Sequence, residues 1–317
     1  MPILRKLPFA LLGLLACGDT GSASSSDEAL QTATHAATLP AVKTVFLILL
    51  ENHNWSQIKG NASAPYINGT LLTSGSHAEN YVNVPGLHPS EPNYIWLEAG
   101  DNLGITTDAV PSKTHSIAAG TDHLSAQLTR AGKTWRAYEE DMPVGTCPIV
   151  ASGHYAPKHN PMVFFQDVSG SPPSQTNAGC IANERPFTEL SGDLAAGKVA
   201  DYNFLTPNLC DDSHGASGCP SDLIKASDDW LSQVIPMIQT SAQYKAGGAI
   251  FITYDESENG DHPIGMIALS PFVTTPGKAS SVQYSHSSTL ATVEEIFGLP
   301  KLRAAATATT LSDLFAP

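Results

Sequence analysis

The sequence V-K-T-V-F-L-I-L-L, residues 42–50, runs directly into E-N-H-N at residues 51–54. A run this apolar is typical of a central strand covered on both faces, as the strands of parallel sheets are. In open α/β sheets, ligands bind at the carboxyl ends of the strands. The polar break that begins at Glu51 therefore marks the place where we expect a functional site.

The same succession of a buried strand and a polar break recurs further along the chain. Residues 201–205 predict a short strand that runs into an acidic loop. Residues 249–254 predict another buried strand, which ends in Asp255-Glu256, and residues 264–269 predict a further one. Polar groups at several strand ends are more informative than any one motif.

Helical spacing appears between and after these strands. Residues 288–297 predict a late helix that ends at Gly298. Residues 221–244 predict a longer helix with an apolar inner face formed by Leu223, Trp230, Leu231, Val234 and Ile238. Strands that alternate with helices predict an α/β fold, a three-layer α/β/α sandwich around a mainly parallel sheet.

The first residues predict export. Arg5 and Lys6 precede an apolar segment, residues 7–16, that is too short to be a permanent membrane span. The segment ends in Leu14-Leu15-Ala16-Cys17, which resembles the lipobox of bacterial lipoproteins and implies a lipid anchor on Cys17. The alternative is an ordinary secretory signal that is removed together with Cys17.

These signals divide the chain into three parts. We expect a lipoprotein-type signal peptide at residues 1–16 and a flexible tether at residues 17–40, where small and polar residues are frequent. Residues 41–317 then form a single folded domain. The chain carries a formal net charge of −14, which repels nucleic-acid backbones and excludes a nucleic-acid-binding function.

Four cysteines follow Cys17. An even number in an exported chain indicates two disulfides, for which three pairings exist. The short loop between Cys210 and Cys219 favours that pair, together with Cys147–Cys180. Zinc binding is the competing interpretation, but no two of these cysteines have the spacing typical of a zinc site.

The strand ends carry groups suited to a hard divalent cation. Glu51, Asn52, Asp255 and Glu256 offer side-chain oxygen atoms, which such cations prefer. The alternative is that each residue caps a neighbouring helix or turn. Two clusters that each follow a buried strand favour a single divalent metal ion. The oxygen-rich set indicates calcium, magnesium, manganese or iron.

The segment His88-Pro-Ser-Glu-Pro-Asn-Tyr94 places a serine between two prolines before an apolar helical stretch. A hydroxyl at a helix start faces free backbone N–H groups and the positive end of the helix dipole, which suits an anion. Ser90 becomes a nucleophile when a base or a metal lowers its pKa. The alternative is a proline-stiffened turn in which Ser90 caps the helix.

Six motifs occur in an order that resembles the bacterial acid phosphatase and phospholipase C family, whose fold is alkaline-phosphatase-like. In the printed sequence they are Glu51-Asn52, His88–Tyr94, Lys158-His159-Asn160-Pro161, Thr206-Pro-Asn208 with Asp212-Ser-His214, Thr253-Tyr-Asp-Glu256, and Ser285-His286. The resemblance covers nearly all of the chain after the tether. One departure is Gly215, which stands where the family commonly has aspartate.

The resemblance implies a role for each matching position. Glu51, Asn52, Asp255 and Glu256 would bind the metal together with the Ser90 hydroxyl, and Asn93 would donate to a phosphoryl oxygen. His159, His214 and His286 would surround the phosphate, and one of them would protonate the leaving alkoxide, a task that suits a side chain with a pKa near neutrality. His88 is either a substrate contact or a structural residue.

The sequence therefore predicts an exported, metal-dependent phosphomonoesterase with a phosphoserine intermediate, whose substrates include phosphoinositides among the phosphate monoesters that the resemblance allows. The alternative enzyme is a phospholipase C-type phosphodiesterase acting on a phospholipid. A non-catalytic surface lipoprotein that binds phosphate or glycans is the alternative from another class. Membrane contact is expected through the lipid on Cys17.

Overall fold

Strand β1 (Thr44–Leu50) occupies the interior of an eight-stranded sheet, and every one of its residues is buried. The computed structural model describes residues 38–317. The strand order is β4-β3-β5-β1-β6-β7-β2-β8. The other strands are β2 (Ser76–Val82), β3 (Trp135–Glu139), β4 (Glu184–Pro186), β5 (Tyr202–Thr206), β6 (Gly248–Tyr254), β7 (Met266–Leu269) and β8 (Ala279–Ser285).

The sheet is mainly parallel, as the sequence predicts. Strand β7 is the exception, because it runs antiparallel to both of its neighbours, β6 and β2. On either side of β1 lie the parallel strands β5 and β6. The register pairs Leu50 with Tyr254, so the residues that follow these two strands, Glu51 and Asp255, emerge side by side.

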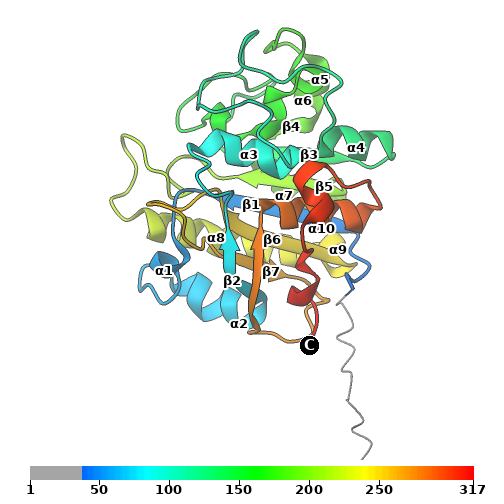
Figure 1. The fold of residues 1–317 in the computed structure, drawn as a ribbon. Coiled ribbons are helices and arrows are strands. Elements are labelled where there is room, and N and C mark those ends of the chain that lie inside the picture. The colour runs from blue at the N-terminus through cyan, green and yellow to red at the C-terminus, as the bar shows by residue number, and fades with distance from the viewer. Residues whose placement is uncertain (1–37) are drawn as a thin grey trace, which may run out of the picture. The chain divides into compact units, whose positions relative to one another are not determined.

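Helices cover both faces of the sheet (Figure 1) and make it a three-layer α/β/α sandwich. Helices α3, α4 and α10 contact one another, and α7, α8 and α9 form a second connected group. The helices are α1 (Trp55–Ile58), α2 (Leu72–Ser74), α3 (Ser90–Ala99), α4 (Leu124–Arg130), α5 (Gln166–Ser169), α6 (Ala178–Asn183), α7 (Leu190–Ala196), α8 (Leu223–Thr240), α9 (Ala242–Lys245) and α10 (His286–Phe297).

The predicted helix over residues 221–244 is two helices. Helix α8 ends at Thr240, because Ser241 adopts an extended backbone conformation. The Ser241 side chain then caps the start of α9 by accepting a hydrogen bond from the backbone N–H of Tyr244. The late helix ends at Gly298 as predicted, but it begins two residues early, at His286. His286 therefore sits in the first turn of α10.

Four strands were not predicted from the sequence: β2, β3, β4 and β8. Strand β8 shows the reason, because it lies at the sheet edge and most of its residues are partly or fully exposed. Strand β2 carries polar residues such as Glu79, and β4 is three residues long. None of them has the continuous apolar run that identified β1 and β6.

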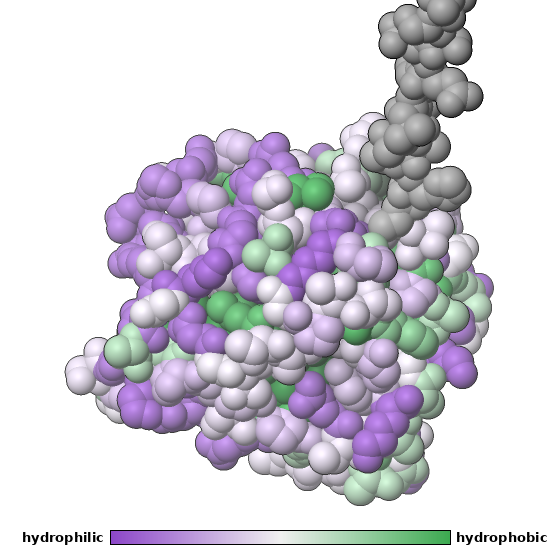
Figure 2. Space-filling model, turned by 90° about the horizontal axis from the view of Figure 1, so that it is seen from below, coloured by the Kyte–Doolittle hydropathy of each residue, from purple (hydrophilic) through white to green (hydrophobic). Residues whose placement is uncertain are grey.

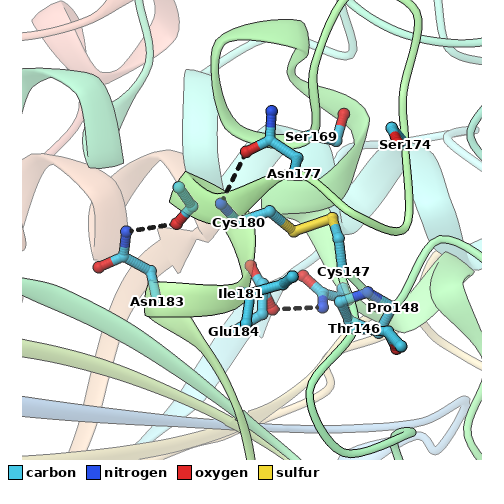
Figure 3. The surroundings of a disulfide bond; sticks show 12 residues. Thr146, Cys147, Pro148, Ser169, Ser174, Asn177, Cys180, Ile181, Asn183 and Glu184 are labelled. Carbon is cyan, nitrogen blue, oxygen red and sulfur yellow. Dashed lines mark hydrogen bonds between the residues drawn. A yellow bond between two sulfur atoms is a disulfide. The ribbon is translucent and has the colours of Figure 1, made fainter.

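Both predicted disulfides are present. Cys147 is bonded to Cys180, and Cys210 to Cys219. Figure 3 shows the first pair, in which Cys180 lies in the opening turn of α6 and its backbone N–H is accepted by the side chain of Asn177 at 3.0 Å. Two disulfides are typical of proteins that mature in an oxidising compartment.

The predicted signal peptide, Cys17 and most of the predicted tether lie outside the described residues. Within residues 38–317, no helix combines the length and the apolar character that a bilayer span requires. On the face seen in Figure 2, hydrophobic residues are scattered in small groups among polar ones. This face therefore offers no broad apolar patch.

Candidate active site

The carboxylate of Glu51 lies at the centre of a buried polar cluster at the carboxyl end of β1. It is fully buried, and Ser90 Oγ donates a hydrogen bond to its Oε2 at 2.9 Å. Its other oxygen, Oε1, accepts from Tyr94 Oη at 2.8 Å and lies 3.2 Å from His159 Nε2. Two segments far from Glu51 in the sequence, the start of α3 and the turn that carries His159, thus converge on its carboxylate.

Ser90 is the first residue of α3. Pro89 precedes it in an extended conformation, and Pro92 lies in the first turn, where a missing N–H costs nothing. The helix ends at Gly100, whose positive φ of 69° terminates it. The Ser90 side chain is buried, so its hydroxyl is held at a helix N-terminus against Glu51.

A second group of side chains adjoins Glu51. Asp255 follows β6, and its Oδ1 accepts the backbone N–H of Asn52 at 2.9 Å. The Asn52 side chain donates to Glu256 Oε1 at 2.8 Å. Asn52 has a φ of 34°, a conformation that asparagine tolerates better than most residues and that tends to mark functional sites.

His159 and His214 lie next to each other at the Glu51 side of the cluster, with ring centroids 5.4 Å apart. Asp212 connects them: its Oδ2 lies 3.0 Å from His159 Nδ1, and its Oδ1 accepts the backbone N–H of His214 at 2.7 Å. Glu51, His159 and His214 each offer a ligand atom, and these atoms lie within 4.8 Å of one another. His159 is buried and His214 is exposed.

The remaining predicted residues contact Asp255 or Glu256. Glu256 Oε2 lies 2.7 Å from His88 Nδ1 and accepts from Asn93 Nδ2 at 3.0 Å. Asn93 Nδ2 also contacts the carbonyl of Leu87 at 2.9 Å, so both of its hydrogens face protein acceptors. His286 Nε2 donates to the carbonyl oxygen of Asp255 at 2.5 Å. His286 thus contacts the backbone of the cluster.

The positions of these groups shift their protonation equilibria. Burial opposes ionisation of Glu51, but the neighbouring positive charges of His159 and Lys158 outweigh it and lower the pKa of Glu51 to about 2. Burial also disfavours the imidazolium of His159, yet the carboxylates of Glu51 and Asp212 raise its pKa to about 9. These two residues therefore form a buried ion pair.

Around Asp255 and Glu256, on the other side of the site, the pKa values of the carboxyl groups are raised and not lowered. Burial, together with the charges of Glu51 and Glu256, raises the pKa of Asp255 well above its usual value. Burial also raises the pKa of Glu256 to about 7, although His88 partly opposes this. Burial lowers the pKa of His286 to about 4, so this histidine is neutral at physiological pH.

The arrangement fits a divalent cation. Asp255 Oδ2 is buried and has no hydrogen-bond partner in the described structure, which is costly for a carboxylate unless a cation or a proton compensates it. Asn52 joins Asp255 and Glu256 through hydrogen bonds, and Glu51 and Ser90, which belong to the same cluster, also offer oxygen atoms, the ligands that hard cations prefer. The residues predicted from the sequence as metal ligands are therefore brought together in space.

Sequence reasoning missed three contributors. Tyr94 belongs to a quoted motif, but its hydrogen bond to Glu51 and its stacking on His159, with ring centroids 5.2 Å apart, were not predicted. Asp212 and Lys158 also lie in quoted motifs without an assigned role. Both could have been found from the sequence, because Lys158 directly precedes His159 and Asp212 lies two residues before His214.

The glycine at position 215 has a structural reason. Its φ is 88°, and an added Cβ would lie 2.7 Å from Leu223 Cδ1. A side chain at this position would strain the loop that carries His214. Glycine stands here in place of the family's aspartate because this loop needs a positive φ and has no room for a side chain at position 215.

The family model described as the Phosphoesterase family matches residues 78–300, more than half of the chain. The chain belongs to the Phosphoesterase family. This phosphoesterase is 28% identical over 281 residues to the phosphatidylinositol-3-phosphatase of Mycobacterium tuberculosis, a match that covers 88% of this chain and 85% of the relative. It is 26% identical over 271 residues to the phosphate-repressible acid phosphatase of Penicillium chrysogenum, covering 80% of this chain and 59% of the fungal protein.

A solved structure supports the predicted fold. A protein of the alkaline phosphatase superfamily from Vibrio parahaemolyticus aligns with a TM-score of 0.56 at 10% identity, covering 87% of this chain and 72% of that one. The alkaline-phosphatase-like α/β/α sandwich is thus confirmed. Family and relatives together make this chain a phosphoric ester hydrolase of the acid phosphatase type, and not a non-catalytic binding protein.

Proposed function

We propose that this phosphoesterase hydrolyses phosphate monoesters, with Ser90 as the nucleophile and a phosphoserine as the intermediate. The observation that carries the proposal is the hydroxyl of Ser90, held at the N-terminus of α3 and hydrogen-bonded to the ionised Glu51. A helix N-terminus favours the negative charge of a phosphoryl group. The name of the mycobacterial relative makes a phosphoinositide monoester a substrate to include in the assays.

The chain's own residues supply the steps of a double displacement. Ser90 Oγ attacks phosphorus in line, its proton moves to Glu51 Oε2, and the bond between phosphorus and the leaving oxygen breaks. His214 gives a proton to the departing alkoxide, because it is the candidate histidine with an exposed side chain. Water then gives a proton to His214 and attacks the phosphoserine, the bond from Oγ to phosphorus breaks, Oγ takes back the proton from Glu51 Oε2, and inorganic phosphate leaves.

Glu51, Asn52, Asp255, Glu256 and the hydroxyl of Ser90 would hold one divalent cation. Such an ion would lower the pKa of the Ser90 hydroxyl and neutralise negative charge on the phosphoryl oxygens. Asn52 and Asn93 orient Glu256 through hydrogen bonds of 2.8 and 3.0 Å. His286 orients the backbone of Asp255 through its hydrogen bond to the Asp255 carbonyl oxygen. These contacts keep the carboxylates in place while the substrate binds.

Ser90→Ala tests the nucleophile. We expect the kcat/KM for p-nitrophenyl phosphate to fall by a factor of about 10³ or more, because no other hydroxyl donates to Glu51 Oε2 in the described structure. Steady-state hydrolysis, measured with and without a chelator, provides the readout. Circular dichroism and thermal melting establish that the variant is folded.

Ser74→Ala is the matched control. Ser74 lies in α2, and its exposed hydroxyl bonds only to the backbone carbonyl of Thr70. This variant should retain the activity of the unmodified protein. A folded Ser90→Ala variant with the kcat/KM of the unmodified protein would contradict the proposal. Release of a phosphorylated headgroup from phosphatidylcholine in place of free phosphate would favour the phosphodiesterase alternative.

We also propose that the protein is exported and lipid-anchored through Cys17. The two disulfides support maturation outside the cytosol. The sequence around Cys17 supports the anchor. Metabolic labelling with a fatty acid tests it: label should be incorporated into the unmodified protein and lost in Cys17→Ser, and equal labelling of the two would contradict it.

A further inference from the structure

Lys158 brings a positive charge to the site for which the mechanism above has no use. It lies in the 3₁₀ turn Pro157–His159, directly before His159. Its Nζ donates to His214 Nε2 at 3.0 Å and to Asp108 Oδ2 at 3.0 Å. An ammonium group can only donate, so His214 accepts at Nε2 and its Nδ1 faces the carbonyl of Gly215 at 2.9 Å.

Asp108 contacts both the Lys158 ammonium group and the helix turn that carries Ser90. Its second oxygen, Oδ1, accepts the backbone N–H of Glu91 at 3.1 Å, and Glu91 follows Ser90 in the first turn of α3. One carboxylate therefore holds both Lys158 and the helix start that carries Ser90. The Lys158 side chain is only 18% exposed, which separates it from surface lysines that extend into solvent.

No other lysine or arginine of residues 38–317 forms a hydrogen bond or ion pair with a residue of the candidate site. The other described lysines and arginines in such contacts pair with residues elsewhere, as Lys225 does with Asp229. The site itself is rich in carboxylates from Glu51, Asp255 and Glu256. An anionic substrate therefore gains more from Lys158 than a neutral one would.

We propose that Lys158 is a specificity-determining residue that contacts the substrate phosphoryl group and selects monoesters over diesters. The inference rests on the proposed function of the site. A monoester carries close to two negative charges at neutral pH, whereas a diester carries one and has an ester group in place of the further charged oxygen. When the substrate binds, Lys158 exchanges its hydrogen bond to His214 for one to a phosphoryl oxygen, and His214 Nε2 then takes up from solvent the proton that it gives to the leaving alkoxide.

Lys158→Met tests the inference with two substrates that share a leaving group. The kcat/KM for p-nitrophenyl phosphate should fall about 100-fold, and that for p-nitrophenyl methyl phosphate less than about 5-fold, because loss of a charge-assisted contact affects the dianion most. Inhibition by inorganic phosphate should weaken about 10-fold or more. Lys158→Arg, which keeps the charge, should recover most of the monoester preference.

Lys225→Met is the control, since this lysine is 55% exposed and lies on α8. It should leave both substrates unaffected. If Lys158→Met lowers both kcat/KM values in the same proportion, or leaves inhibition by phosphate unchanged, the inference is wrong and Lys158 is structural. If the unmodified protein fails to hydrolyse the monoester, the proposed function itself is wrong. Should Lys158→Met not fold, Lys158→Gln decides, because it removes the charge and keeps a polar side chain: an unchanged ratio of the two substrates in the folded Lys158→Gln variant overturns the inference.

Discussion

Single carboxyl groups in this molecule behave differently according to their neighbours. Glu51 is fully buried and remains ionised, because Ser90, Tyr94 and His159 surround its two oxygens. Glu184, in β4, is equally buried but has only Asn160 as a hydrogen-bond donor, at 2.7 Å. Its other oxygen has no partner among the described residues. The difference in partners decides which carboxyl keeps its charge.

Glu184→Gln should change how stability depends on pH. Burial raises the pKa of Glu184 to about 8, and the hydrogen bond from Asn160 only partly opposes this. Between its ordinary pKa and about pH 8, the folded state holds a proton that the unfolded state has released. The free energy of unfolding therefore falls as pH rises through this window, by up to about 1.4 kcal/mol per pH unit from this group. Glutamine removes this contribution.

Urea unfolding at several pH values between 5 and 8 provides the measurement. The stability of Glu184→Gln relative to the unmodified protein should increase steadily with pH. Glu189→Gln, a substitution of a partly exposed glutamate paired with Arg185, should show no such trend. Parallel pH profiles for Glu184→Gln and the unmodified protein would contradict the raised pKa.

Pairing between elements places the site. Because β1 and β6 are parallel neighbours in register, Glu51 and Asp255 emerge together, and the Asp255 N–H donates to the carbonyl of Leu50 at 2.9 Å. This part of the site could be predicted, since both strands are continuous apolar runs followed by acidic residues. The contribution of α3 could not be predicted from periodicity alone, because its position depends on packing against α10 and not on its own sequence.

Gly265→Ala should destabilise the connection between these elements. Gly265 precedes β7 with a φ of 75°, and an added Cβ would lie 2.2 Å from the ring of Trp55 in α1. The carbonyl of Gly265 also accepts a hydrogen bond from Thr253 in β6 at 2.7 Å. Strain and overpacking should together cost about 2 kcal/mol or more of folding free energy.

Thermal and urea unfolding measure this effect. Gly69→Ala is the matched control, because an added Cβ there meets no atom within 4 Å and the backbone has no positive φ. That variant should be neutral or slightly stabilised. Equal stability of the Gly265 and Gly69 variants would show that Trp55 moves aside without cost.

Across the whole molecule, the sequence predicts the interior better than the edges. The α/β class, the parallel centre of the sheet and both disulfides follow from apolar runs and cysteine spacing. The edge strand β8 was missed, because half-exposed strands have weak patterns. Strand β7 was predicted, but its antiparallel direction was not, because strand direction depends on tertiary pairing. Lys158 was missed for a similar reason: its importance lies in what it contacts across distant segments.

The central claim is that these segments converge to make Ser90 the acceptor of the phosphoryl group. Acid-quenched turnover of p-nitrophenyl phosphate, followed by mass spectrometry of proteolytic peptides, tests it most directly. The account predicts that the peptide containing Ser90 gains the mass of one HPO₃ on the Ser90 side chain, and that Ser90→Ala shows no such species. A phosphoryl group found on His159, His214 or any other side chain during turnover would contradict it.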